Sequence, residues 1–126
     1  NNPMRTEAKR WNRGDCVVRA MAYVMNISWQ DAYTLLCAKG AEMYEIPNSQ
    51  MVYEAVLKEQ GYIKVSCPAV KGKKRMTVED FCKKNMKGRY FLSVANHVTA
   101  VEKGVCYDVW NPANKVVYTY WVKKSV

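Results

Sequence analysis

The sequence predicts an α+β fold in which N-terminal helices pack on a C-terminal antiparallel sheet. Residues 15–85 carry helix signals, including two N-terminal capping patterns, interrupted by one short apolar segment. Residues 90–122 are instead rich in Val, Tyr and Trp, and turn residues divide them into short segments. Helices followed by strands are typical of the α+β class. Residues 1–126 contain no repeat or linker, so we expect a single domain.

A central helix is expected over residues 16–25. Asp15 is a good N-cap residue, and the following residues are apolar almost all round. A helix with this pattern is buried on most faces, which places it in the middle of the domain. Asn26 is expected to end it. Residues 1–14 have few periodic apolar positions and are expected to form an extended polar segment.

The remaining elements follow from capping patterns, turn residues and strand composition. Ser28–Asp31 and Thr77–Asp80 each resemble a capping box, with Asp in the place of Glu. The expected helices cover residues 28 to about 39, 48–61 and 77 to about 85. The expected strands cover residues 62–67, 90–94, 97–101, 105–110 and 116–122, with turns at 103–104 and 111–114.

The net charge and the lengths of the apolar segments indicate which classes of partner to expect. Lys and Arg outnumber Asp and Glu by 20 to 11, for a net charge of +9. This charge is compatible with nucleic acid or an acidic partner, but no nucleic-acid-binding module accompanies it, so nucleic acid is not the favoured partner. No segment reaches the roughly 20 apolar residues of a membrane span, and residues 1–5 do not resemble a secretory signal. We therefore expect no membrane partner.

The cysteines indicate a reducing compartment, which we take to be the cytoplasm. Their number is five, which is odd, and their spacing is irregular, so a disulfide framework is not expected. No two of them form a CxxC pair, and there is one histidine, so neither a zinc site nor another cofactor is expected. Most of the thiols are expected to pack as small apolar groups.

Cys16 differs from the other cysteines because it starts the central helix. The unpaired amide groups and the dipole at a helix N-terminus stabilise negative charge. A thiol attacks well only as the thiolate, and this position lowers its pKa below the value of about 8.5 for a free cysteine. The backbone N–H of Cys16 is also a natural donor to a developing oxyanion. The sequence therefore predicts Cys16 as a nucleophile.

His97 is the only histidine, so any imidazole-dependent mechanism must use it. If Lys103 and Gly104 form a two-residue hairpin turn, Thr99 faces Asp108 across the hairpin. Asp108 then lies diagonal to His97, with Cα atoms about 7–8 Å apart. We expect Asp108 to accept the Nδ1 proton and Nε2 to face the thiol. The alternative is a half-buried histidine that only bonds to a neighbour.

Four neighbouring residues are candidates for supporting roles. Trp110, opposite His97, is expected to shield the histidine–aspartate hydrogen bond from water. Arg19 lies one turn after Cys16 and is expected to pair with Asp15, or else to hold a substrate carboxylate. Asn111 is an alternative to Asp108, although the following proline indicates a turn.

The order of these residues resembles that of the papain-like cysteine peptidases. Asp108-Val109-Trp110 resembles the Asn-x-Trp of papain-type enzymes, with Asp in place of Asn. Residues 11–20 (WNRGDCVVRA) and 96–101 (NHVTAV) look still more like small papain-like proteins encoded by phages and prophages. The resemblance implies a papain-like fold, a Cys16–His97–Asp108 triad and a protein or peptide substrate. For a phage-encoded protein it also implies the host cytoplasm.

The resemblance is incomplete around the oxyanion. Papain-type enzymes have a glutamine a few residues before the cysteine, whereas no glutamine precedes Cys16. Asn12 stands in the matching region, with Arg10 and Arg13 as alternatives. Three functions stay open: a hydrolase of a peptide, isopeptide or side-chain amide bond, a peptidoglycan amidase or endopeptidase, and a non-catalytic papain-like protein. The last would bind a host factor or nucleic acid through its basic surface.

Overall fold

The computed structural model describes residues 15–108 and 111–123, and this part of the chain has an α+β architecture. Its four helices are α2 (Cys16–Met25), α3 (Trp29–Met43), α4 (Gln50–Glu59) and α5 (Val78–Lys84). Its five strands are β1 (Tyr62–Ser66), β2 (Arg89–Val94), β3 (His97–Glu102), β4 (Val105–Tyr107) and β5 (Thr119–Lys123). The α+β prediction is therefore confirmed.

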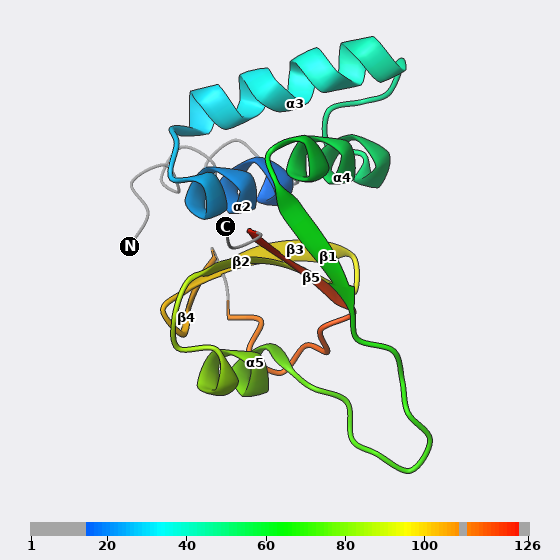
Figure 1. The fold of residues 1–126 in the computed structure, drawn as a ribbon, viewed down its shortest axis with the longest axis vertical. Helices are drawn as coiled ribbons and strands as arrows, with labels where there is room; N and C mark the ends of the chain where they lie inside the picture. Colours follow the sequence, from blue (N-terminus) through cyan, green and yellow to red (C-terminus); the bar gives the residue numbers. More distant parts are fainter. Residues whose placement is uncertain (1–14, 109–110, 124–126) are drawn as a thin grey trace.

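The strands form one antiparallel sheet in the order β1-β5-β2-β3-β4. Helices α2, α3 and α4 lie on one side of the sheet and α5 lies on the other (Figure 1). Two apolar cores result. The larger core lies between α2–α4 and the sheet and contains Met21, Phe91 and Trp121, whereas the smaller one joins α5 to the opposite face through Phe81 and Leu92.

Helix α2 is the central element that the sequence predicts. Seven of its ten residues are buried, and it packs mainly on β3 of the sheet. It ends at Asn26, which adopts the left-handed conformation at φ 56° and directs its backbone N–H back to the last turn. This packing brings the first residue of α2 close to the start of β3.

The hairpin between β3 and β4 has the predicted register. Lys103 and Gly104 both have positive φ, at 52° and 77°, as a two-residue type I′ turn requires. Glu102 consequently pairs with Val105, and Ala100 pairs with Tyr107. Strand β4 ends there, so Asp108 lies one residue beyond it.

Among the element boundaries that differ from the prediction, the end of α3 and the start of β5 have an identifiable reason. Helix α3 continues past Lys39 to Met43. Gly40 does not end the helix, because it is a buried helical residue that leaves room for the loop after the helix. A Cβ at Gly40 would lie 2.7 Å from the Glu45 carbonyl oxygen. Strand β5 begins at Thr119 because Val116 is engaged in an isolated bridge to Thr77.

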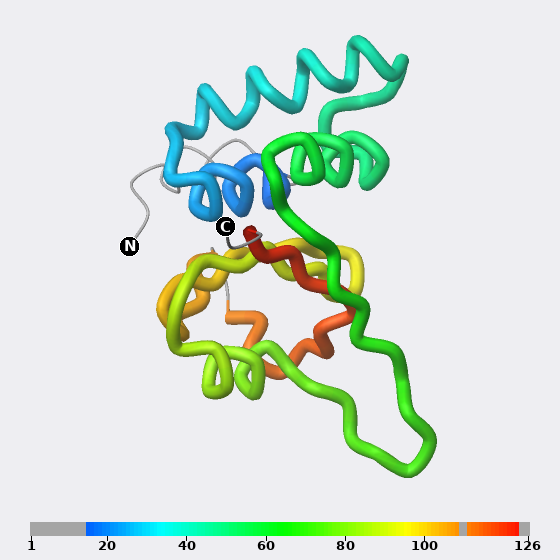
Figure 2. Tube along the Cα trace, in the orientation of Figure 1, coloured from blue at the N-terminus to red at the C-terminus, as the bar shows by residue number. Residues whose placement is uncertain are grey.

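The chain between β1 and α5 protrudes from the body as a long loop over residues 67–77 (Figure 2). This loop contains Lys71, Lys73 and Lys74, all of them exposed. Arg75 is less exposed, because it donates to the Cys67 carbonyl at 2.9 Å and lies over the Tyr118 ring.

Candidate active site

Cys16 is the first residue of α2 and is half-buried. The first hydrogen bond of the helix runs from the Arg19 N–H to the Asp15 carbonyl at 3.0 Å. The amides of Cys16, Val17 and Val18 precede that bond and take no part in the hydrogen-bond ladder of the helix. The Cys16 thiol therefore stands at the positive end of the helix dipole.

The His97 ring lies between Cys16 and Asp108. Its Nε2 is 2.5 Å from the Asp108 Oδ2. The sequence prediction that Asp108 bonds to Nδ1 is wrong, because the hairpin register indicates which residues are neighbours but does not fix the rotation of the imidazole ring. With Nε2 committed to the carboxylate, Nδ1 is the nitrogen left for the thiol.

The pKa values of Cys16 and His97 are both shifted in the direction that favours the charged form of each side chain. Burial alone would raise the pKa of the Cys16 thiol. Hydrogen bonds with the His97 side chain and the Val98 backbone, together with the charges of His97 and Arg19, hold its pKa below the ordinary value. Burial would likewise lower the pKa of His97, but its bonds with Asp108 and Cys16 raise that pKa to about 9. The arrangement therefore favours a thiolate–imidazolium pair.

Three of the other thiols have pKa values shifted in the opposite direction. Burial raises the pKa of Cys67 and Cys82, and it raises the pKa of Cys106 to about 11. All five cysteines are free. Cys16 therefore differs from Cys67, Cys82 and Cys106 in environment as well as in sequence position.

Asp108 is held from its other side by a buried ion-pair network. Arg19 donates through Nη1 to Asp108 Oδ1 at 3.3 Å and through Nε to Asp15 Oδ1 at 2.8 Å. Trp29 Nε1 donates to the second Asp15 oxygen at 3.3 Å. The side chains of Asp15, Arg19 and Asp108 are 8%, 8% and 3% exposed. These bonds connect the start of α2 to Asp108 after β4 and to Trp29 at the start of α3.

This network confirms the predicted pairing of Arg19 with Asp15 and corrects the role of Asp15 at the helix start. Asp15 occupies the N-cap position, but its carboxylate makes no capping bond. The Asp15 carboxylate instead accepts hydrogen bonds from the Arg19 guanidinium, one turn along the helix, and from the Trp29 indole. A charged partner inside the protein binds a carboxylate more strongly than a neutral backbone amide does.

A cleft of about 430 Å³ opens beside Cys16 and His97. Polar side chains from α4, from the loop before it and from the β2–β3 hairpin line the cleft: Asn48, Gln50, Tyr53, Ser93 and Asn96. Sequence reasoning did not identify these residues, because no local pattern indicates that the start of α4 packs beside the start of α2. Among the residues that the structure describes, the lining carries no ionisable side chain besides Cys16, His97 and Tyr53, and this described part is suited to neutral polar groups such as amides.

Tyr53 is the buried member of this lining. Burial raises the pKa of Tyr53, the Ser93 hydroxyl acts against that rise, and the negative charges of Glu54 and Cys16 add to it. The effect of Cys16 places the Tyr53 hydroxyl within electrostatic range of the thiol. Tyr53 and Cys16 both line the cleft, so the Tyr53 hydroxyl is a candidate donor to a carbonyl bound there.

Of the other predicted site residues, Asn111 is described and is not part of this arrangement. The Asn111 side chain is exposed and accepts the Ala113 N–H at 3.0 Å, as expected for a turn residue. Asn12 and Trp110, as well as Arg10 and Arg13, lie outside the described residues.

Neither a protein-family model, nor a curated protein, nor a solved structure matches this chain. Within residues 15–108 and 111–123, no three His, Cys, Asp or Glu side chains are grouped to hold a metal ion. The described helices are also too short or too polar to span a membrane.

Proposed function

We propose that this chain is a cysteine-nucleophile hydrolase that acts on a peptide, isopeptide or side-chain amide bond. The observation that carries the proposal is the meeting of Cys16, at the start of α2, with His97, whose Nε2 is bonded to Asp108. The thiol supplies a nucleophile, the imidazole moves the proton and the carboxylate orients the imidazole. Proteins of the papain-like superfamily, which the sequence resembles, use the same order of residues.

The first chemical step forms a thioester. The Cys16 thiolate attacks the amide carbonyl carbon, and the carbonyl π electrons move to oxygen to give a tetrahedral oxyanion. When the oxyanion collapses, the carbon–nitrogen bond breaks and the His97 imidazolium gives its proton to the leaving amine. The products of this step are a free amine, a thioester on Cys16 and a neutral imidazole.

The second step consumes one water molecule. His97, now neutral, accepts a proton from water while the water oxygen attacks the thioester carbon. Collapse of this second oxyanion breaks the carbon–sulfur bond and releases a carboxylic acid. The Cys16 thiolate and the His97 imidazolium are then restored.

The oxyanion needs hydrogen-bond donors near Cys16. Its own backbone N–H lies outside the helix ladder and is one such donor. Asn12 is the second donor that the resemblance implies. The polar side chains that line the cleft, Tyr53 among them, are further candidate donors.

The proposal is tested by the reactivity of the thiol. At about pH 6 an ordinary cysteine is almost entirely protonated, so iodoacetamide is expected to label Cys16 well before Cys67, Cys82 and Cys106. Peptide mapping by mass spectrometry identifies the labelled residue. His97→Ala is expected to abolish the preference because burial still raises the pKa of the Cys16 thiol, whereas the hydrogen bond and the charge of His97 no longer lower it.

Two results would refute the proposal. One is labelling of Cys16 at about pH 6 no faster than labelling of the other thiols. The other is preferential labelling that persists in His97→Ala, which would show that another group activates the thiol. A folded Thr77→Ala variant, altered far from the site at the start of α5, is the matched control and should retain the preference.

A non-catalytic binding protein is the second candidate, and the exposed lysines of the 67–77 loop are the observation in its favour. It would associate with an anionic partner through charge rather than through the thiol. Salt-sensitive association that is unchanged in Cys16→Ala, together with an unreactive thiol, would favour this function over hydrolysis.

A further inference from the structure

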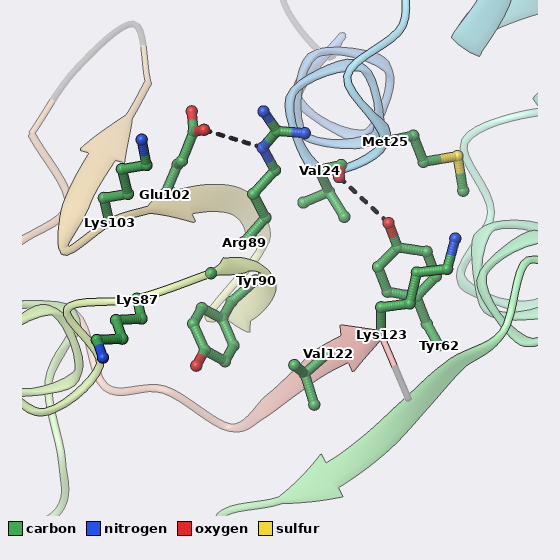
Figure 3. A pocket seen from close by; sticks show the side chains of 11 residues that line it. Val24, Met25, Tyr62, Lys87, Arg89, Tyr90, Glu102, Lys103, Val122 and Lys123 are labelled. Carbon is green, nitrogen blue, oxygen red and sulfur yellow. Dashed lines mark hydrogen bonds and ion pairs between the residues drawn. The ribbon is translucent and has the colours of Figure 1, made fainter. Parts of the chain in front are cut away.

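A second pocket lies at the other end of α2 from Cys16. Its volume is about 660 Å³, within the usual range of small-molecule sites. The end of α2, the starts of β1 and β2 and the ends of β3 and β5 surround it. Figure 3 shows the side chains of this pocket, with Arg89 standing between Glu102 and Tyr62. We call it the basic pocket because four cationic side chains line it.

The charges that line the basic pocket do not balance. Among the residues that the structure describes, its cationic residues are Lys87, Arg89, Lys103 and Lys123, and its single carboxylate is that of Glu102. Arg89 Nε donates to Glu102 Oε2 at 3.0 Å, which leaves an excess of three positive charges. Within residues 15–108 and 111–123, no ion pair engages any of the three lysines, although Lys123 lies over the Tyr62 ring at 5.7 Å.

A structural role for these cations would be to neutralise the negative C-terminal end of α2. The hydrogen bonds of α2 argue against this role. The Ala22 and Tyr23 carbonyls accept backbone N–H groups at 3.0 and 3.2 Å, and the Val24 carbonyl accepts the Tyr62 hydroxyl at 3.2 Å. Three carbonyls of the last turn are therefore satisfied without the lysines.

The donors of the pocket fit a phosphate better than a single carboxylate. The Arg89 terminal amino groups form no hydrogen bond with any residue that the structure describes, and they can bind two oxygens of one oxyanion side by side. The lysine ammonium groups add point charges at the rim, which suit a group with more than one negative charge. A phosphate monoester carries about −1.5 to −2 charges at neutral pH.

We propose that the basic pocket binds the phosphate group of a small phosphorylated ligand. Arg89 contacts the phosphate in the wall of the pocket, and Lys87, Lys103 and Lys123 close around it from the rim. Glu102 holds the Arg89 guanidinium through Nε and keeps its terminal amino groups free for the ligand. This site is separate from Cys16 and does not depend on the hydrolase proposal.

Isothermal titration calorimetry with inorganic pyrophosphate tests this site, at about 0.1 M salt so that long-range attraction is screened. We expect saturable binding of one pyrophosphate per chain. The double variant Lys87→Gln/Lys103→Gln should weaken binding about tenfold, and Arg89→Gln should weaken it at least as much. Cys16→Ala should bind as the wild type does. Thermal unfolding of each variant shows that it is folded.

The matched control is Lys71→Gln/Lys73→Gln, which removes the same charge from the exposed 67–77 loop. It should change the affinity by less than about twofold. Equal weakening by the two double variants would overturn the proposal, because it would indicate attraction to the overall charge. So would the absence of saturable binding. Tighter binding of a single-stranded oligonucleotide, weakened equally by both pairs, would show that nucleic acid is the partner instead.

Discussion

Replacement of Arg19 by methionine tests the buried network that joins α2 to Asp108. Methionine keeps much of the volume of the side chain but removes the guanidinium that bonds to Asp15 and Asp108. The three side chains are at most 8% exposed, so water cannot replace the lost bonds in place. The variant therefore leaves carboxylate charge inside the protein.

The loss in free energy of unfolding depends on which carboxylate loses its counter-charge. Asp108 keeps His97, whose raised pKa holds it protonated at neutral pH. Among the described residues, Asp15 keeps only the Trp29 N–H, a neutral donor at 3.3 Å. Removing one partner of a buried ion pair costs about 3–5 kcal/mol, and because only one carboxylate is stranded we expect about 3 kcal/mol.

This loss is measured as a change in Tm by circular dichroism. With an unfolding entropy of about 2.1 cal/mol/K per residue over 126 residues, 3 kcal/mol corresponds to a decrease of about 10 °C. The control is Lys83→Met, which removes a lysine from a widely exposed pair with Glu79 and should shift Tm by about 2 °C or less. A shift for Arg19→Met no larger than that of the control would refute the role of the network.

Two further results are expected. Because the native pKa of His97 is about 9 and its ordinary value is 6.5, the native state binds this proton more tightly than the unfolded state between those pH values. The stability of the wild type relative to His97→Gln, from urea unfolding, should therefore be largest below pH 6.5 and should fall as the pH rises through about 9; a difference independent of pH would contradict the shift. Gly104→Ala should lower Tm more than Gly72→Ala, because both positions have positive φ but a Cβ at Gly104 would lie 2.6 Å from Met86 Sδ, whereas Gly72 has open space. Equal shifts for the two alanine variants would show that Met86 moves aside without cost.

Much of the fold follows from local sequence patterns. The bounds of α2 and the register of the β3–β4 hairpin were both predicted, because an almost wholly apolar segment and a Lys-Gly turn leave few alternatives. The capping box at Thr77 and Asp80 is present with both of its hydrogen bonds. Such features depend on residues within about one turn or one hairpin of each other.

Features that depend on distant residues were not predictable in the same way. The Asp15 carboxylate was expected to cap α2, but it bonds to Arg19 and to Trp29 of the following helix. The ring orientation of His97 depends on side-chain packing that strand register does not determine. The lining of the cleft depends on how the start of α4 meets the start of α2, and nothing in the sequence around Gln50 or Tyr53 indicates that contact.

The type I′ turn at Lys103-Gly104 also constrains how the chain can vary. His97 and Asp108 are 11 positions apart, and the two-residue turn lies between them. One inserted residue in this turn would move the carboxylate to the opposite face of the hairpin, whereas insertions in the protruding 67–77 loop leave the spacing intact. Relatives that retain the chemistry should therefore differ in length at the loop and not at the turn. A histidine and an aspartate at this separation, flanking a Gly-containing turn, make a more discriminating search pattern than overall similarity.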